Sequence, residues 1–337
     1  MRNKNFGQHL SEYFLKYISR QTGYSINTIK SYRDTFTIFL RYLNDELRIK
    51  PEKLSFEKMS KKMIEEFMIW LEEDKKYSVS TRNQRLAAIH AFFRYVQIEA
   101  PENLNLCNCI LSIHTKKVVE STIPYLTIDA VKVLLEAIDI RTKKGRRDLT
   151  LIALLYDSAA RVQEIADLTV GDIGLSPATV RLKGKGNKTR IIPIVVQTAK
   201  LLDTYLKEYG LDGEQSINLP VFSNRNNHKL TRAGITYILS KYVEIARKKT
   251  PKLFRKKVTP HILRHSKSMH LLQANVNLIY IRDFLGHASV ITTERYAKAD
   301  SEIKRKAIEK ASSNIVPDKN YSKKEKHELL SWLKAIV

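Results

Sequence analysis

The chain lacks the features that mark secreted and membrane proteins. Only two cysteines occur in 337 residues, Cys107 and Cys109, and their spacing is too tight for the usual structural disulfide or a four-ligand zinc site. We therefore expect ordinary thiols in a reduced, cytoplasmic protein. No apolar run approaches the roughly 18 residues of a membrane span, and the charged start, Met1–Asn5, leads into no apolar signal-peptide segment. We expect no membrane partner.

Motifs for bound nucleotides and metals are also missing. The sequence contains no Gly-x-x-x-x-Gly-Lys-Ser/Thr loop, and Gly184-Lys185-Gly186 is too short to serve as one. His261 and His265 are four residues apart, but the glutamate of a His-Glu-x-x-His helix is absent and no cysteine is near. We expect neither a metal nor a cofactor.

Acidic residues are scarce relative to basic ones. Asp and Glu total 35 against 59 Lys and Arg, which gives a formal charge of +24. So large a surplus favours a polyanionic partner, above all nucleic acid, although a merely soluble basic protein has the same composition. The length predicts two domains of roughly 100–200 residues.

Residues 6–100 show an almost wholly helical pattern. Apolar residues recur at helical spacing within 26–43, where Ser25 is a plausible N-cap, and Ser80 is the candidate N-cap of a later helix that extends through Val96. Basic residues interleave with this pattern. Each one alone fits a solvated helix face, but together they predict a helical DNA-binding domain over residues 1–110, with the candidate phosphate contacts Lys30, Arg33, Arg82 and Arg85.

Residues 100–123 lose this periodicity, and we interpret them as a connection that contains a linker at 111–123. A second domain is predicted over 124–311, with one helix beginning near Thr127 and an apolar helix at 149–158. Strands at 179–183 and 189–194 flank a glycine-rich turn and predict a hairpin. Further helices are expected at about 195–210, 231–249, 261–274, 277–285 and 289–295. The predicted fold class is mainly α, with a mixed α/β second domain that is mostly helical and holds a small antiparallel sheet.

The second half carries residues suited to metal-free phosphodiester chemistry. Arginine binds phosphate through its planar fork and stays charged at working pH, so Arg161 and Arg264 are candidates for holding the phosphate. His261 and Arg264 share one helix face. Thr259 and Pro260 suit the N-cap and first position of that helix, where free N–H groups attract an anion. Taken alone, a histidine in such a motif is more often a surface or core residue, because a His-x-x-Arg match is common by chance.

A nucleophile and an acid are also available. Tyrosine forms covalent intermediates, and Tyr296 follows Leu285-Gly286-His287 within ten residues. One tyrosine among 16 is more often structural, so the ordered set of motifs singles this one out. Lys185, in the hairpin turn, can donate a proton to a leaving alkoxide, a role for which Lys183 and Lys188 compete.

These residues carry a family resemblance. The chain resembles the tyrosine site-specific recombinases of the phage-integrase and Xer type, in particular integrase-type transposases of site-specific transposons and conjugative elements. The matching blocks are Ala160-Arg161-Val162-Gln163-Glu164-Ile165, Lys183 to Arg190, Thr259-Pro260-His261-Ile262-Leu263-Arg264-His265, Leu285-Gly286-His287 and Thr292-Thr293-Glu294-Arg295-Tyr296. Two departures are small: Ala159-Ala160 stands where Gly-Leu is common, and Ser266-Lys267-Ser268 stands where small residues are usual.

The resemblance implies a tyrosine recombinase fold and a role for each matched residue. Tyr296 would form a 3′-phosphotyrosine, Arg161 and Arg264 would clamp the phosphate, and Lys185 would protonate the 5′-oxygen. The remaining implied roles are His261 as acid and base, His287 as a hydrogen-bond donor to a non-bridging oxygen, and Glu164 as a supporting acidic residue.

The resemblance also implies strand exchange on double-stranded DNA, by a dimer on one site and a tetramer in the synaptic complex. The tail at 312–337 ends in apolar residues that one helix cannot bury alone. The resemblance implies that this tail docks on a neighbouring protomer, and docking in cis is the alternative. Two other functions stay open at this point. One is type IB topoisomerase-like DNA relaxation, and the other is DNA binding without catalysis.

Overall fold

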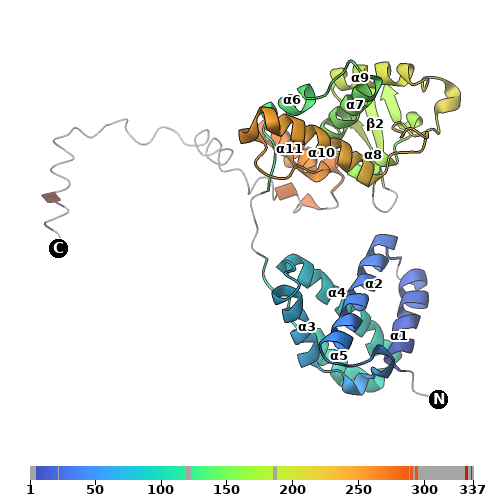
Figure 1. The fold of residues 1–337 in the computed structure, drawn as a ribbon, viewed down its shortest axis with the longest axis vertical. Coiled ribbons are helices and arrows are strands. Elements are labelled where there is room, and N and C mark those ends of the chain that lie inside the picture. Colours follow the sequence, from blue (N-terminus) through green and yellow to red (C-terminus); the bar gives the residue numbers. More distant parts are fainter. Residues whose placement is uncertain are drawn as a thin grey trace. The chain divides into compact units, whose positions relative to one another are not determined.

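The computed structural model describes residues 5–21, 23–118, 123–184, 188–287, 289–290, 293–294, 331–332 and 335. The chain divides into two compact units, Met1–Ser121 and Thr122–Val337 (Figure 1). Lys185, Tyr296 and nearly all of the tail at 312–337 lie outside the described residues. Within the described residues, no helix is both long and apolar enough to cross a membrane.

The first unit is entirely helical in its described residues. Its elements are α1 (Phe6–Glu12), the π-helical segment η1 (Tyr13–Gln21), α2 (Ile26–Asp45), α3 (Lys61–Glu73), α4 (Val79–Glu99) and α5 (Leu104–Leu111), with 3-10 turns at Pro51–Lys53, Phe56–Lys58 and Pro101–Asn103. Phenylalanine and tyrosine rings dominate its core, and Phe92 on α4 makes edge-on contacts with Phe6, Tyr13 and Phe36. These contacts join α1, η1, α2 and α4 into one unit.

Helix boundaries in this unit confirm one prediction and correct two. The side chain of Ser25 accepts a hydrogen bond from the amide of Thr28, as an N-cap does. The N-cap of α4 is Ser78, not Ser80, because the Ser78 side chain is the one that accepts from the Thr81 amide. The expected connection at 100–123 begins with helix α5, whose Cys107 and Ile110 are buried in the core. Eight residues are too few for a helical period to be evident in the sequence.

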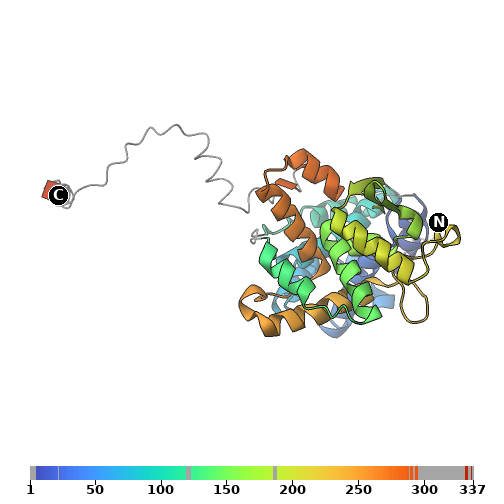
Figure 2. The same cartoon turned by 90° about the horizontal axis from the view of Figure 1, so that it is seen from above.

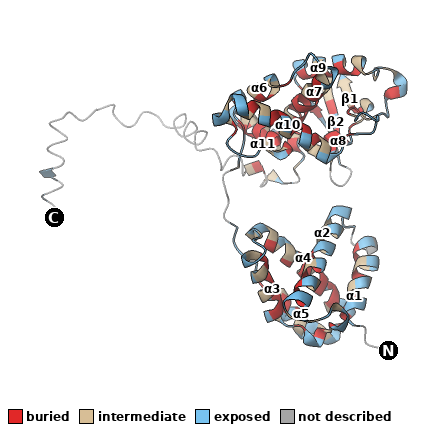
Figure 3. Ribbon diagram, viewed as in Figure 1, coloured by how far each residue is buried: buried red, intermediate tan, exposed pale blue. Residues whose placement is uncertain are grey.

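The second unit surrounds a small sheet with helices. It contains α6 (Ile128–Glu136), α7 (Lys143–Asp157), α8 (Val162–Ala166), β1 (Ile173–Leu175), β2 (Ala178–Lys183), β3 (Thr189–Pro193), α9 (Val196–Glu208), α10 (Arg232–Lys249), α11 (Pro260–Gln273) and α12 (Leu278–Leu285). Helix α7 is the most buried of these helices and packs on both α9 and α11 (Figures 2 and 3). Helix α11 is therefore packed against the central helix of the core.

The sheet is antiparallel with strand order β1-β2-β3. The predicted hairpin is present, with Val180 opposite Ile192 and Lys183 opposite Thr189. The third strand, β1, was not predicted because three residues are too few to show alternation. The mainly helical fold with a small antiparallel sheet is confirmed.

Candidate active site

The first turn of α11 presents one exposed and one buried candidate residue. Thr259 caps the helix by accepting a hydrogen bond from the Ile262 amide, and Pro260 occupies the first helical position, as expected. His261 lies on the surface, whereas Arg264 is only 2% exposed. An arginine so deeply buried needs acceptors inside the protein, and its partners show where it is directed.

Arg161 begins α8 and is tied to a carboxylate three residues later. The Arg161 amide donates to Glu164 Oε2 at 2.7 Å, and Arg161 Nη1 donates to Glu164 Oε1 at 2.9 Å. Glu164 also accepts two hydrogen bonds from Arg190 on β3, at 2.9 and 2.8 Å. Burial raises the pKa of the Glu164 carboxyl, but the hydrogen bonds and charge of Arg190 and Arg161 outweigh burial and hold this pKa below its ordinary value.

Three arginines converge on the C-terminal end of α12. Arg190 Nε donates to the carbonyl of Phe284 at 3.1 Å, and Arg264 Nη2 donates to the carbonyl of Leu285 at 2.5 Å. Arg161 Nη2 donates to the carbonyl of Gly286 at 3.3 Å. The last carbonyls of a helix have no partner within the helix and carry partial negative charge, so cations are favourable there. These three bonds join segments from α8, β3, α11 and α12.

Gly286 allows this convergence for two reasons. Its φ of +62° is left-handed, which ends α12 and which only glycine adopts readily. A side chain on Gly286 would also meet Arg190, because an added Cβ would lie 3.0 Å from Nη1 and 3.1 Å from Cζ. The Leu285-Gly286-His287 motif is therefore a helix end against which an arginine packs closely.

His287 follows directly and faces the same arginines. Its Nδ1 lies 3.1 Å from Thr293 Oγ1. Burial, together with the charges of Arg264, Arg161 and Arg190, lowers the pKa of His287 to about 4. Partial burial and the charges of Arg264 and Arg161 likewise lower the pKa of His261. Both imidazoles are therefore neutral near pH 7.

The described residues that border Lys185 and Tyr296 lie at this cluster. An added Cβ at Gly184 would be 3.4 Å from Glu164 Oε1 and 3.5 Å from Arg190 Nη1. The Gly184 amide also donates to the Lys188 carbonyl at 2.8 Å, which closes the hairpin turn. Lys185 is the next residue along the chain. Tyr296 follows Thr293 by three residues, a reach of at most about 11 Å.

Arg190 is a site residue that did not appear among the sequence candidates. Its guanidinium reaches both Glu164 and the end of α12. The sequence held a signal for it, because side chains alternate along a strand and Ile192, two residues later, is buried. An arginine on the core-facing side of a strand indicates a buried acceptor.

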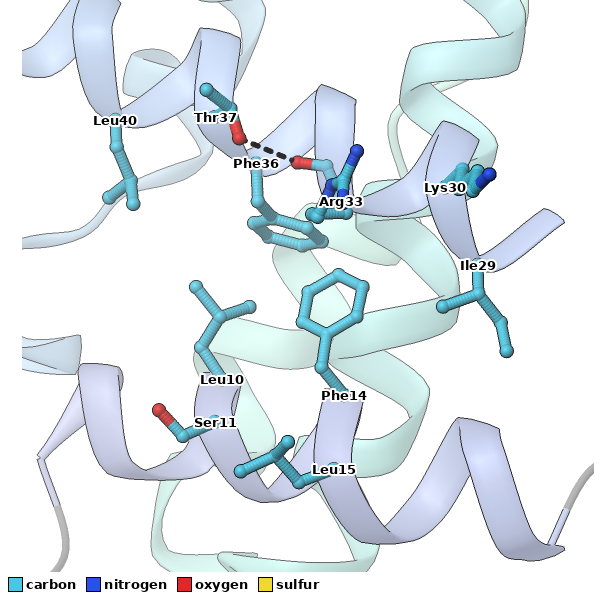
Figure 4. Close-up of a pocket in the computed structure, with 10 residues that line it drawn as sticks. All are labelled: Leu10, Ser11, Phe14, Leu15, Ile29, Lys30, Arg33, Phe36, Thr37 and Leu40. Carbon is cyan, nitrogen blue, oxygen red and sulfur yellow. Dashed lines mark hydrogen bonds between the residues drawn. The ribbon is translucent and has the colours of Figure 1, made fainter. Parts of the chain in front are cut away.

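Two of the candidate DNA contacts in the first unit are exposed. Lys30 and Arg33 on α2 lie at the rim of an apolar groove of about 470 Å³ between α2 and the α1–η1 segment (Figure 4). Figure 4 shows Phe14 and Phe36 facing each other across this groove. Arg33 has an exposed neighbour, Asp34, at 3.3 Å. Both cations are accessible to a large polyanion.

Arg82 and Arg85 are instead bonded to other residues inside the first unit, which corrects their expected role as phosphate contacts. Arg82 is 5% exposed, pairs with Glu72 at 3.4 Å and donates to the carbonyl of His114 at 3.2 Å. Arg85 donates to the Ser31 carbonyl at 3.0 Å and thus joins α4 to α2. Helical spacing does not reveal such partners, because they lie on other segments of the chain, between ten and more than fifty residues away in the sequence.

The two departures from the family pattern have structural counterparts. Ala159 adopts a left-handed φ of 46°, the region that glycine favours, and its carbonyl accepts from Arg264 Nη1 at 2.7 Å. Lys267 pairs with Asp157 at 2.8 Å, with both side chains largely buried. Asp157 also accepts from the Val195 amide at 2.7 Å, just before α9. Lys267 thus connects the active-site helix to the start of α9.

The described residues contain no group of three or more His, Cys, Asp or Glu side chains that could hold a metal ion. The positive charge at the site comes from Arg161, Arg190 and Arg264, with Glu164 as the carboxylate among them. This arrangement is suited to holding a phosphodiester, which carries a single negative charge.

Comparison with known proteins agrees with this description. Residues 124–302 match the model of the Phage integrase family, and residues 10–102 match the phage integrase N-terminal SAM-like domain. The "Putative integrase/recombinase y4rC" of Sinorhizobium fredii is 37% identical over 318 residues, which are 92% of this chain and 95% of that protein. The tyrosine recombinase XerC of Herpetosiphon aurantiacus is 31% identical over 88% of this chain and 92% of its own length.

Solved structures share the fold. The integrase of the Tn1549 transposon, bound to transposon right end DNA, superposes with a TM-score of 0.68 at 17% identity and covers 90% of this chain and 99% of that one. The XerH recombinase in a post-cleavage complex with its difH substrate gives a TM-score of 0.66 at 23% identity, over 84% of this chain and 79% of that one.

Fold and site together define a tyrosine-type DNA recombinase. The chain belongs to the phage integrase family. It is accordingly an enzyme of site-specific recombination that cleaves and rejoins DNA, and DNA is its partner.

Proposed function

We propose that this recombinase cleaves DNA by direct attack of Tyr296 on the scissile phosphate. The Tyr296 oxygen forms a bond to phosphorus as the bond to the 5′-oxygen breaks, which leaves a 3′-phosphotyrosine and a free 5′-hydroxyl. His261 accepts the phenol proton, and Lys185 donates a proton to the departing 5′-oxygen. Because no water enters, the reverse reaction rejoins DNA without a metal or nucleotide.

The observation that carries this proposal is the convergence of Arg161, Arg190 and Arg264 on the end of α12. Arg161 and Arg264 are assigned to the two non-bridging oxygens, where charge accumulates in the transition state. Removing one such placed donor costs on the order of 3–4 kcal/mol in other enzymes, a fall of about 100- to 1,000-fold in rate. Glu164 and Arg190 hold the clamp in position.

His287 is assigned a hydrogen bond to a non-bridging oxygen. Its lowered pKa keeps the ring neutral, so one nitrogen carries a proton and the other accepts. If Nδ1 accepts from the Thr293 hydroxyl, Nε2 carries the proton and serves as the donor. The proximity of Gly184 to Glu164 and Arg190 supports a lysine of this hairpin turn as the acid. We assign the role to Lys185, because Lys183 pairs with Asp172 at 3.9 Å.

The test uses a suicide substrate, a nicked duplex with the recognition site from which the cleaved strand cannot be rejoined. We expect the wild type to form a covalent protein–DNA adduct, Tyr296→Phe to form none, and Arg264→Lys to form it at least 100-fold more slowly. A covalent adduct with Tyr296→Phe would overturn the nucleophile assignment. Tyr237→Phe is a matched control, because this tyrosine is 72% exposed on α10.

We further propose that the enzyme acts in the cytoplasm as a dimer on one site and a tetramer in synapsis. An apolar hollow of about 300 Å³ on the second unit supports a role for the tail, and it is lined by Val195, Leu271, Val276, Tyr280, Ile281 and Phe284. The apolar residues of the tail, from Leu329 to Val337, fit such a surface on a neighbouring protomer. Tyr280→Asp is expected to leave DNA binding intact and abolish synaptic tetramers in gel-shift experiments, and tetramers that persist with this variant would exclude the hollow.

A further inference from the structure

One long stretch of the second unit carries no acidic residue. No Asp or Glu occurs between Glu244 and Asp283, and this stretch includes both His261 and Arg264. Six exposed cations gather at its start, between the end of α10 and the beginning of α11: Lys248, Lys249, Lys252, Arg255, Lys256 and Lys257. No ion pair joins any of the six to a carboxylate among the described residues. Their charge is therefore directed at solvent.

A second basic run shows that neighbouring cations in this chain do not always lack acidic partners. Residues 141–147 hold five cations in seven positions, but Arg141, Arg146 and Arg147 pair with Asp139, Glu208 and Asp148. Lys143 donates to the Glu208 carbonyl and lies 4.3 Å from the centre of the Tyr209 ring. That run is committed to internal contacts, whereas the cations at 248–257 are not.

The segment at 251–258 is built to hold its cations in place. Phe254 and Val258 are 1% and 5% exposed and anchor it in the core. Arg247 Nε donates to the Phe254 carbonyl at 2.8 Å, and Arg247 Nη2 donates to the Lys256 carbonyl at 3.1 Å. The acidic residue that precedes the segment in the sequence, Glu244, is itself paired with Arg247. Because the backbone is fixed before any ligand arrives, binding costs little conformational entropy.

The position of this segment identifies the ligand. Lys257 precedes His261 by four residues, so their Cα atoms are at most about 14 Å apart. Phosphates on one DNA strand repeat every ~3.4 Å along the helix axis. We propose that Arg255, Lys256 and Lys257, with Lys252 beside them, form a platform that binds the DNA backbone within about four phosphates of the scissile one. This proposal rests on DNA cleavage at the site described above.

Such a platform positions DNA without reading its sequence. Lysines and an arginine on a braced loop contact phosphates, and phosphate contacts fix register rather than specificity. The platform directly precedes the anion-binding first turn of α11 in the protein chain, so the two bind neighbouring phosphates of the DNA. The recombinase would thus hold the scissile phosphate and its neighbours with one continuous segment, residues 252–264.

The test compares two triple variants of equal charge. The platform variant is Arg255→Ala, Lys256→Ala and Lys257→Ala. The control is Lys132→Ala, Lys144→Ala and Lys200→Ala, which removes three exposed lysines from α6, α7 and α9. Affinity for a random-sequence duplex is measured between about 50 and 200 mM salt. The platform variant is expected to lower the slope of log affinity against log salt by up to about 2.7, so that its affinity falls about 40-fold less over this range.

A second measurement locates the contacts. Ethylation of backbone phosphates is expected to interfere with binding of the wild type and the control at up to four phosphates beside the cleaved one, and this local interference should vanish for the platform variant. Equal slopes for the platform variant and the control would overturn the proposal, as would an unchanged interference pattern. Adduct formation on the suicide substrate at low salt is measured in parallel. If the wild type forms no adduct, that result contradicts the proposed cleavage chemistry and leaves the platform unaffected.

Discussion

Replacing Glu164 by glutamine tests whether one carboxylate organises the arginines of the site. The Glu164 side chain is 3% exposed and accepts four hydrogen bonds at 2.7–2.9 Å from Arg161 and Arg190. Glutamine keeps the shape but turns one acceptor oxygen into an NH2 donor, which would face N–H groups that are donors themselves. The change therefore removes both the counter-charge and half of the acceptors.

The magnitude follows from burial. Removing one partner of a buried ion pair costs about 3–5 kcal/mol, and because glutamine retains one acceptor we expect about 3 kcal/mol. For a domain of about 150–250 residues this lowers the melting temperature by roughly 6–12 °C. Glu208→Gln is the control, because its partner Arg146 is 39% exposed and solvent weakens such a pair, so we expect a much smaller fall in melting temperature. Thermal melting followed by circular dichroism distinguishes the two.

Acid and DNA provide two further measurements on the same variant. The pKa of Glu164 is lowered on folding, so its stabilisation is complete above the unfolded-state pKa and is lost as pH falls through the folded-state pKa. The glutamine variant lacks this loss. Duplex DNA should raise the melting temperature of Glu164→Gln more than that of the wild type, because a phosphate supplies the missing charge. A variant that melts within about 1 °C of the wild type would refute the reasoning.

Three further predictions concern neighbouring residues. Gly286→Ala should lower stability by about 1–2 kcal/mol in thermal melting and should also lower adduct formation, because the added Cβ meets Arg190. Gly210→Ala is the control, because its φ is +64° but the space around it is open, so this variant should lower stability alone. The pKa of His287 is about 4 in the folded state against 6.5 in the unfolded state, so the unfolded state binds the proton first as pH falls. Stability should therefore fall by up to roughly 3 kcal/mol between pH 6.5 and 4. His287→Gln should flatten this dependence of the melting temperature on pH. Lys267→Ala should cost about 3 kcal/mol in urea unfolding, since it leaves Asp157 buried without its cation, and a loss below about 1 kcal/mol would contradict that role.

Features fixed by local chemistry were predictable from the sequence. The Ser25 and Thr259 caps and the hairpin around Gly184 depend on neighbours within a few residues, and their side-chain and backbone patterns are visible in the chain. Arg82 and Arg190 depend on partners that are far away in sequence. Arg82 resembled any basic residue on a helix, yet it is closed in by Glu72 and His114. Which charges face solvent is thus a property of the fold.

The same holds for the geometry that connects the motifs. The sequence shows an arginine after Ala160 and a glycine before His287, but not that Gly286 supplies a carbonyl to Arg161. That contact requires the end of α12 to lie beside Arg161, and the packing of α12 on α11 and of α8 on α10 and β2 decides this. The sequence therefore supplied candidates for the reacting groups, and the structure explains why Gly286 cannot be replaced without displacing Arg190.

The charge balance of the site supports the proposed role of His261 as the base. Arg161, Arg190 and Arg264 against Glu164 leave 3 − 1 = +2, and this field, with burial, lowers the pKa of His261. A neutral imidazole is what the acceptor of a phenol proton must be. Binding a phosphodiester adds one negative charge beside the ring, which favours the protonated form and so strengthens the base when substrate is present. In the proposed mechanism the arginines thus have two effects: they bind the phosphate, and their charge, with burial, keeps His261 neutral and able to accept the phenol proton.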